Sequence, residues 1–213
     1  MEVVPGCHFN AAFRAKTIGL HCTFKILTVS QQFDFTSIDS AVMTNTASIP
    51  RHADDHMKLA ISLARKSPPK PTNYCVGAVL INPDSNEELA TGYTLECEGN
   101  THAEQCCFIK FAESRGIAED RLYEQLPLTT ALYTTMEPCN FRLSGNMSCV
   151  DRIIAARNIK TVYVGVREPE KFVGENEGRK KLEEHGIQFA HVPGFEKEIL
   201  EVATAGHVRE DER

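Results

Sequence analysis

Residues 128–149 read LTTALYTTMEPCNFRLSGNMSC, and this stretch decides the fold. Its first part, Leu128 to Thr135, is largely apolar and β-branched, which predicts a buried strand. The strand leads directly into Glu137-Pro138-Cys139. Nine residues separate Cys139 from Cys149, which opens a segment that predicts a helix as far as Arg157. A buried strand joined by a cysteine-bearing loop to a helix indicates an α/β fold.

The chain on both sides of this stretch continues the alternation. Before it, the sequence predicts a helix from a cap at Asp54 or Asp55 through Ala64, a strand at 76–81, a returning strand at 88–94 and a helix from 102 to 114. After it come a strand at 161–166, a helix at 177–185, a strand at 187–191 and a helix at 195–203. A hairpin followed by strands that alternate with crossover helices predicts a mixed sheet of about five strands in a three-layer α/β/α sandwich. Residues 1–50 show no sustained periodicity, so we expect an N-terminal extension, partly disordered, before one domain at 51–213.

Composition narrows the classes of function. The net charge is −6 and the pI is about 5.8, which argues against the broad basic surface that nucleic-acid binding usually needs. No signal-peptide pattern opens the sequence, and no apolar run approaches the roughly 18 to 20 residues of a membrane-spanning helix. The eight cysteines therefore fit a reducing compartment better than a disulfide framework, and we expect a soluble, cytoplasmic protein with a small-molecule substrate.

Three residues predict a metal site. His102, Cys139 and Cys149 supply three zinc-type ligands, which leaves the fourth tetrahedral position of a Zn²⁺ ion free for water. Glu104, two residues after the histidine, is expected to carry protons. Both ligand-bearing segments begin predicted helices, where unpaired amides and the helix dipole favour thiolates. Each residue alone has a simpler structural interpretation, as a cap or a buried thiol, but the spacing of the set favours a catalytic zinc site.

The chemistry follows from this set of residues. Zinc lowers the pKa of a bound water towards about 7, and a neighbouring carboxylate can take the proton and later deliver it to a leaving amine. Hydrolytic deamination of a pyrimidine or purine uses these parts, with ammonia as a product. Cys106 and Cys107 lie beside the motif, but their place in the apolar pattern predicts core packing.

The order of four motifs resembles the cytidine deaminase superfamily. They are Asn73 to Ala78 (NYCVGA), His102-Ala103-Glu104, Thr135 to Asn140 (TMEPCN) and Cys149. Because the two cysteines are nine residues apart rather than two, the chain is most similar to the riboflavin-pathway pyrimidine deaminases, in their fungal form. The resemblance covers roughly residues 52 to 205.

This resemblance implies a substrate and a set of contacts. The expected reaction is deamination of 2,5-diamino-6-ribitylamino-4(3H)-pyrimidinone 5′-phosphate, with zinc as the cofactor and a homodimer as the assembly. Asn73, Ala103 and Asn140 are expected to contact the substrate. Arg142 and Ser144, in the loop between the cysteines, are the candidates for phosphate or polyol binding, since arginine suits a phosphate.

Three other functions remain open at this stage. A deaminase of another nucleobase or nucleoside would use the same chemistry, because pocket selectivity lies in loops. A tRNA adenosine deaminase should show basic and aromatic surface, of which this acidic chain without tryptophan offers little. A non-catalytic zinc-binding scaffold is a different class, and the presence of Glu104 argues against it.

Overall fold

The structure is a computed structural model that describes residues 49–167 and 177–207. The predicted extension at 1–50 lies outside the described residues, apart from its last two. The described residues all belong to one compact unit, Thr44–Arg213.

Five strands form one mixed sheet in the order β2-β1-β3-β4-β5. The strands are β1 (Gly77–Asn82), β2 (Glu87–Tyr93), β3 (Thr130–Met136), β4 (Ile159–Val166) and β5 (Gln188–His191). Strand β1 pairs antiparallel with both β2 and β3, whereas the β3–β4 and β4–β5 pairs are parallel. The predicted hairpin and parallel crossovers are therefore confirmed.

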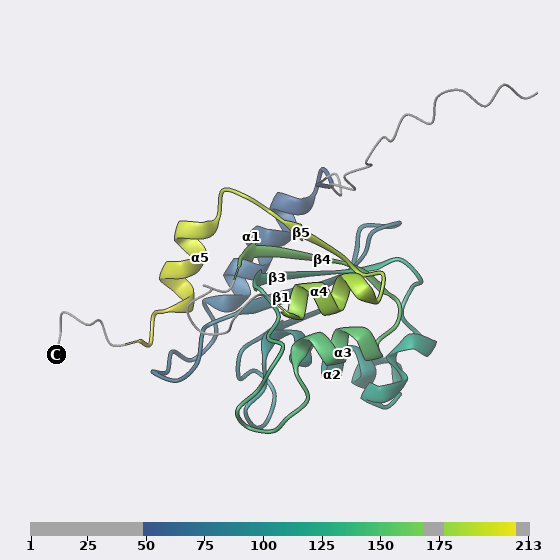
Figure 1. The fold of residues 1–213 in the computed structure, drawn as a ribbon, viewed down its shortest axis with the longest axis horizontal. Coiled ribbons are helices and arrows are strands. Elements are labelled where there is room, and N and C mark those ends of the chain that lie inside the picture. The colour runs from purple at the N-terminus through teal and green to yellow at the C-terminus, as the bar shows by residue number, and fades with distance from the viewer. Residues whose placement is uncertain (1–48, 168–176, 208–213) are drawn as a thin grey trace, which may run out of the picture. The chain divides into compact units, whose positions relative to one another are not determined.

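Helices cover both faces of the sheet (Figure 1). One face carries α2 (Ala103–Arg115), α3 (Cys149–Ala155) and α4 (Glu177–Glu184), and the other carries α1 (Ala53–Ala64) and α5 (Glu196–Ala203). A hydrophobic core lies on each face of the sheet, and alternate residues of each central strand pack into one core or the other. In β3, Leu132 packs with Phe108 and Ile153 on the first face, whereas Tyr133 packs with Met57 on the second. The predicted three-layer sandwich is thus confirmed.

Two glycines let helices approach the sheet closely. A Cβ at Gly77 in β1 would lie 1.9 Å from the main-chain oxygen of Ala60 in α1. A Cβ at Gly92 in β2 would lie 2.2 Å from the main-chain oxygen of Ala103, the first residue of α2. Since real Cβ atoms do not come so near, both helices sit where they do because these positions carry no side chain.

Two local predictions were wrong, and one element was missed. Helix α1 is capped by His52, and Asp54 and Asp55 lie in its first turn. Strand β3 begins at Thr130 rather than Leu128, because Leu128 lies before the sheet and is 74% exposed. A short 3₁₀ helix, η1 (Glu119–Glu124), was not predicted.

Helix η1 is held by distant contacts. Its Leu122 is buried in the core, and its Glu119 pairs with Arg152 of α3. Its own six residues, EDRLYE, carry no helical apolar periodicity. In the described part of the chain, no helix is both long enough and apolar enough to cross a membrane.

Candidate metal centre and active site

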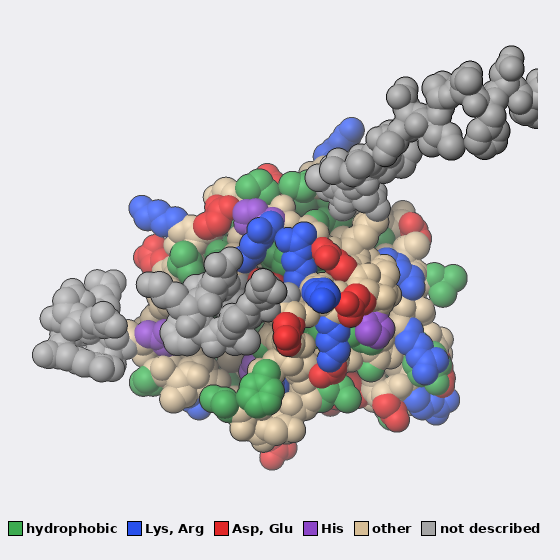
Figure 2. Space-filling model, viewed as in Figure 1, with side chains coloured by type: hydrophobic (Ala, Val, Ile, Leu, Met, Phe, Trp, Pro, Cys, Tyr) green, Lys and Arg blue, Asp and Glu red, His purple; other side chains and the backbone are tan. Residues whose placement is uncertain are grey.

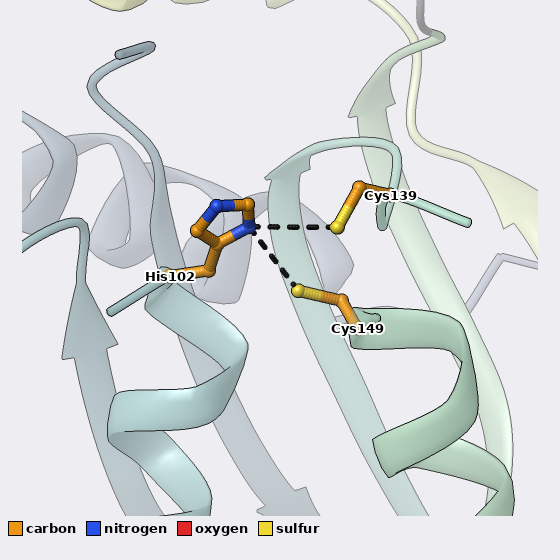
Figure 3. A group of neighbouring side chains, drawn as sticks. All are labelled: His102, Cys139 and Cys149. Atoms are coloured by element: carbon orange, nitrogen blue, oxygen red, sulfur yellow. Dashed lines mark hydrogen bonds between the residues drawn. The ribbon is translucent and has the colours of Figure 1, made fainter. Parts of the chain in front are cut away.

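The three predicted ligands come together at one end of the sheet (Figure 3). His102 is the N-cap of α2, Cys139 lies in the loop after β3, and Cys149 is the first residue of α3. Their ligand atoms all lie within 4.8 Å of one another. In the described ranges, this is the one group of three or more histidine, cysteine or acidic side chains with that geometry.

The distances within this group match a tetrahedral ion. His102 Nδ1 lies 3.5 Å from Cys139 Sγ and 3.4 Å from Cys149 Sγ. Zinc bonds of about 2.3 Å to sulfur and about 2.0–2.1 Å to nitrogen, set at the tetrahedral angle, would separate N and S by about 3.6 Å. The donor set and its spacing therefore fit a zinc ion.

The two thiols differ in their protonation. A hydrogen bond from Cys149, together with the neighbouring His102, lowers the pKa of Cys139 to about 4. The pKa of Cys149 is raised well above its ordinary value, because it bonds to Cys139 and is buried beside Glu104. The Cys149 thiol therefore keeps its proton more readily than Cys139 does, and a divalent cation that binds both sulfurs would displace that proton.

The cap of α3 fixes the position of Cys149. The Ser148 side-chain oxygen accepts a hydrogen bond from the Asp151 amide at 3.1 Å and donates one to Asp151 Oδ2 at 2.7 Å. This is a reciprocal N-cap arrangement. The Val150 amide also donates to Cys139 O at 3.2 Å, which links the two cysteine-bearing segments.

Glu104 lies beside the three ligands and is 3% exposed. Burial raises the pKa of its carboxyl group, while the nearby His102 acts in the opposite direction. Its Oε2 lies 3.3 Å from Cys149 Sγ, and its Oε1 lies 3.3 Å from the Thr134 hydroxyl on β3. A desolvated carboxyl group with a raised pKa is suited to accepting and returning a proton near neutral pH.

A cavity of about 420 Å³ opens onto this group. The cavity is of a size that holds small ligands. It is lined by Thr72, Asn73, Tyr74, Val76, Thr94, Asn100, His102, Glu104, Met136, Glu137, Cys139, Phe141, Arg142, Leu143 and Ser144.

The predicted substrate contacts divide into two groups. Asn73, Arg142 and Ser144 line the cavity. Ala103 and Asn140 are not among the lining residues: Ala103 packs in the core, and Asn140 is half-buried with its Oδ1 lacking a hydrogen-bond partner in the described structure. Their contact with a substrate stays a prediction.

Arg142 is buried rather than solvated, with 5% exposure. Its guanidinium group donates to the main-chain oxygen of Asn100 and, at 2.9 Å, to Gln105 Oε1. Both acceptors are neutral. Among the described residues, no carboxylate lies within 4.0 Å of this cation. A buried charge normally has a partner of opposite sign, so the arrangement favours an anion in the cavity.

Sequence reasoning missed several residues of the site. Asn100 and Gln105 hold Arg142, and Thr134 contacts Glu104. No signal in the sequence marks them, because each acts through a contact between distant segments. Cys106 and Cys107 are fully buried, as predicted from the apolar pattern.

The site region matches a known family model. The model described as the cytidine and deoxycytidylate deaminase zinc-binding region matches residues 50–166. A diaminohydroxyphosphoribosylamino-pyrimidine deaminase of Schizosaccharomyces pombe is 34% identical over 172 residues, which cover 81% of this chain and 40% of that protein. The chain therefore spans about two fifths of the length of this relative.

The chain is also similar to solved structures of pyrimidine deaminases. The Aspergillus oryzae Rib2 deaminase, a C-terminal deletion mutant at pH 4.6, is 44% identical with a TM-score of 0.69 over 76% of this chain and 95% of that chain. The same deaminase in complex with DARIPP is 43% identical, with a TM-score of 0.67 over 75% and 93% of the two chains. A Thermotoga maritima diaminohydroxyphosphoribosylaminopyrimidine deaminase/5-amino-6-(5-phosphoribosylamino)uracil reductase is 28% identical, with a TM-score of 0.55 over 70% and 38%.

Proposed function

Because the chain belongs to the cytidine and deoxycytidylate deaminase zinc-binding family, we propose that it is a zinc-dependent hydrolytic deaminase of riboflavin biosynthesis. The proposed substrate is 2,5-diamino-6-ribitylamino-4(3H)-pyrimidinone 5′-phosphate, and the products are 5-amino-6-ribitylamino-2,4(1H,3H)-pyrimidinedione 5′-phosphate and ammonia. One observation carries the proposal: a His–Cys–Cys group and a buried glutamate share a cavity with an arginine that has no acidic partner among the described residues. The pyrimidine deaminase names of the relatives support the substrate class.

His102, Cys139 and Cys149 would hold the zinc ion. Bound there, zinc would act as a Lewis acid that makes water nucleophilic at neutral pH. Three protein ligands leave one position open, as in catalytic rather than structural sites. Because the pKa of Cys149 is raised in the protein alone, binding of the ion would displace the proton of this thiol.

Glu104 would move the protons of the reaction. Its carboxylate would take a proton from the attacking water and pass it to a ring nitrogen of the pyrimidine. It would then carry the proton of the new hydroxyl group to the amine, so that the C–N bond breaks, ammonia leaves and a carbonyl group remains. The Thr134 hydroxyl contacts this carboxylate at 3.3 Å from Oε1, and its one proton is shared with Met136 O at 3.0 Å. Burial keeps competing water away from this carboxylate.

Arg142 would bind the phosphate of the substrate. Two of its donor groups hold Asn100 and Gln105, and the rest of its five N–H donors remain for an anion in the cavity that it lines. A phosphate would supply the negative charge that the buried guanidinium lacks. Ser144 and Asn73, on other parts of the cavity wall, would contact the ribityl chain or the ring.

Surface and thiol chemistry support three further parts of the proposal. Acidic and basic side chains are interspersed on the face shown in Figure 2, in keeping with a small-molecule substrate rather than a nucleic acid. Phe141, Leu143 and Met147 are 71%, 97% and 51% exposed, which supports a homodimer that light scattering would detect. The six cysteines in the described ranges are free thiols, which supports a cytoplasmic location that imaging of a tagged chain would test.

The test is ammonia release by the purified zinc-loaded protein. The ribityl-pyrimidinone phosphate, its ribosyl counterpart and cytidine are assayed in parallel with the Glu104→Gln variant. We expect turnover of the ribityl compound only, and its loss in the variant with zinc retained. Turnover of cytidine alone, or of none of the three, would overturn the proposed function.

A further inference from the structure

One wall of the cavity lies just outside the sheet. Thr72, Asn73 and Tyr74 line the cavity, whereas strand β1 begins only at Gly77. Within this segment the local backbone pairing is a single isolated bridge between Lys70 and Asn73, with the Asn73 amide 3.3 Å from Lys70 O. The wall therefore needs support from elsewhere in the fold.

Part of that support comes from Asn100, whose Oδ1 accepts a hydrogen bond from Asn73 Nδ2 at 3.1 Å. The rest comes from the last residue of α5 and the residues that follow it, about 130 positions further along the chain. The Cys75 amide donates to Ala203 O at 3.0 Å. His207 Nε2 lies 3.2 Å from Asn73 O, and because a carbonyl oxygen only accepts, Nε2 is the nitrogen that carries the proton. The His207 ring also packs on Tyr74, with the ring centres 4.7 Å apart and the planes inclined by 58°.

The backbone of this C-terminal segment lies directly against the wall. A Cβ at Gly206 would lie 2.3 Å from the Lys70 nitrogen, so the two backbones are in close contact. The segment keeps its own shape through turns, in which the Ala205 amide donates to Val202 O at 3.2 Å and the His207 amide to Thr204 O at 2.9 Å. These turns join the segment directly to the end of α5, and α5 packs on the sheet.

We propose that the segment 204–207 is a positioning element of the active site, in which His207 holds Asn73 and Tyr74 in place to receive the substrate. This inference rests on the proposed function for its kinetic consequence but not for its structural one. Because His207 touches the wall and not the reacting atoms, its loss should weaken binding of the substrate and transition state alike. Such a loss raises KM and leaves kcat unchanged.

The experiment compares four variants with the full chain. His207→Ala removes both contacts, His207→Phe keeps a ring against Tyr74 without the donor, and His207→Gln keeps a donor near the position of Nε2. A chain that ends at Thr204 removes residues 205–213, Gly206 and His207 among them, while keeping α5 whole. The control is His185→Ala, since His185 is exposed and its Nδ1 bonds a main-chain oxygen, that of Lys181, away from the cavity.

Two readouts are measured on each zinc-loaded protein: steady-state ammonia release, and hydrogen–deuterium exchange of the amides of residues 71–76. Loss of one hydrogen bond predicts a rise in KM of about 2- to 10-fold in His207→Ala and His207→Phe. The shortened chain should show a larger rise. In His207→Ala, His207→Phe and the shortened chain, we expect kcat within about 2-fold of the full chain, unchanged zinc content and faster exchange at 71–76. In His207→Gln and the control, we expect KM and exchange close to those of the full chain.

The outcomes separate this inference from the proposed function. If the full chain releases no ammonia from either pyrimidinone phosphate, the proposed function fails, and the exchange measurement alone decides the inference. Unchanged exchange at 71–76 in both His207→Ala and the shortened chain would overturn it. A fall in kcat at constant KM would also overturn it, because that result reports a smaller fraction of active protein rather than a displaced wall.

Discussion

Replacement of Arg142 by methionine tests how the site recognises its substrate. Methionine keeps much of the apolar stem but removes the charge and all five donors. The change has two separable consequences in this structure. It releases Asn100 and Gln105 from the loop between the cysteines, and it removes the proposed partner of the phosphate. Loss of the loop contacts affects turnover of any substrate, whereas loss of the phosphate partner affects turnover of a phosphorylated substrate only.

The expected loss of kcat/KM follows from the hydrogen bond that Arg142 would make to the phosphate. A hydrogen bond that involves a charged group contributes about 1.5–3 kcal/mol, so loss of the phosphate contact should lower kcat/KM about 10- to 150-fold. The same variant acting on the dephosphorylated substrate should lose only the contribution of the loop contacts. The ratio of the two losses is the coupling between Arg142 and the phosphate, as in a double-mutant cycle.

The assay is ammonia release with the phosphorylated and dephosphorylated substrates, on the original chain and on Arg142→Met, with zinc content measured in both. A matched control is Arg65→Met, because Arg65 is exposed and forms a surface ion pair with Glu198. It should change neither substrate's kcat/KM by more than about 2-fold. Equal losses on both substrates in Arg142→Met would falsify the phosphate role and leave Arg142 as a loop contact only.

Three further changes test the rest of the site and its support. Cys139→Ala should release zinc together with activity, since only two protein ligands remain, and stoichiometric zinc by elemental analysis would contradict the assignment. Thr134→Val should lower kcat about 10-fold with zinc retained, because Glu104 loses its hydroxyl partner, whereas Thr134→Ser should restore it; an unchanged kcat in the valine variant would exclude this role. Gly77→Ala should destabilise the fold by about 3 kcal/mol or more in urea unfolding, because its Cβ would meet Ala60 O at 1.9 Å, and an unfolding midpoint close to that of the original chain would show that α1 can move away.

The layers of the fold could be predicted because the buried strands are strongly patterned. All seven residues of β3 are buried, so an uninterrupted run of apolar and β-branched residues marked it in the sequence. The boundary at Leu128 was misjudged for the same reason, since an exposed leucine looks like a buried one in a sequence. Helix η1 was missed because it is held by burial of Leu122 in the core and by the ion pair of Glu119 with Arg152, neither of which a local sequence pattern shows.

The candidate site was predictable where its chemistry is carried by residue type. The metal-type ligands and Glu104 stand out by identity and spacing, and the structure brings them together. The surroundings could not be predicted in the same way. The burial of Arg142 and the contact of His207 with Asn73 both depend on segments that meet only after folding.

The close approach at Gly92 links a position outside the cavity to the chemistry within it. Any side chain there would push against Ala103 O at the start of α2, the helix that begins beside His102 and contains Glu104. In a saturation library selected for growth without riboflavin, position 92 should therefore tolerate as few substitutions as the ligands themselves. We therefore expect the glycine at this site to be needed for placing His102 and Glu104 as well as for folding, although no atom of it touches the cavity.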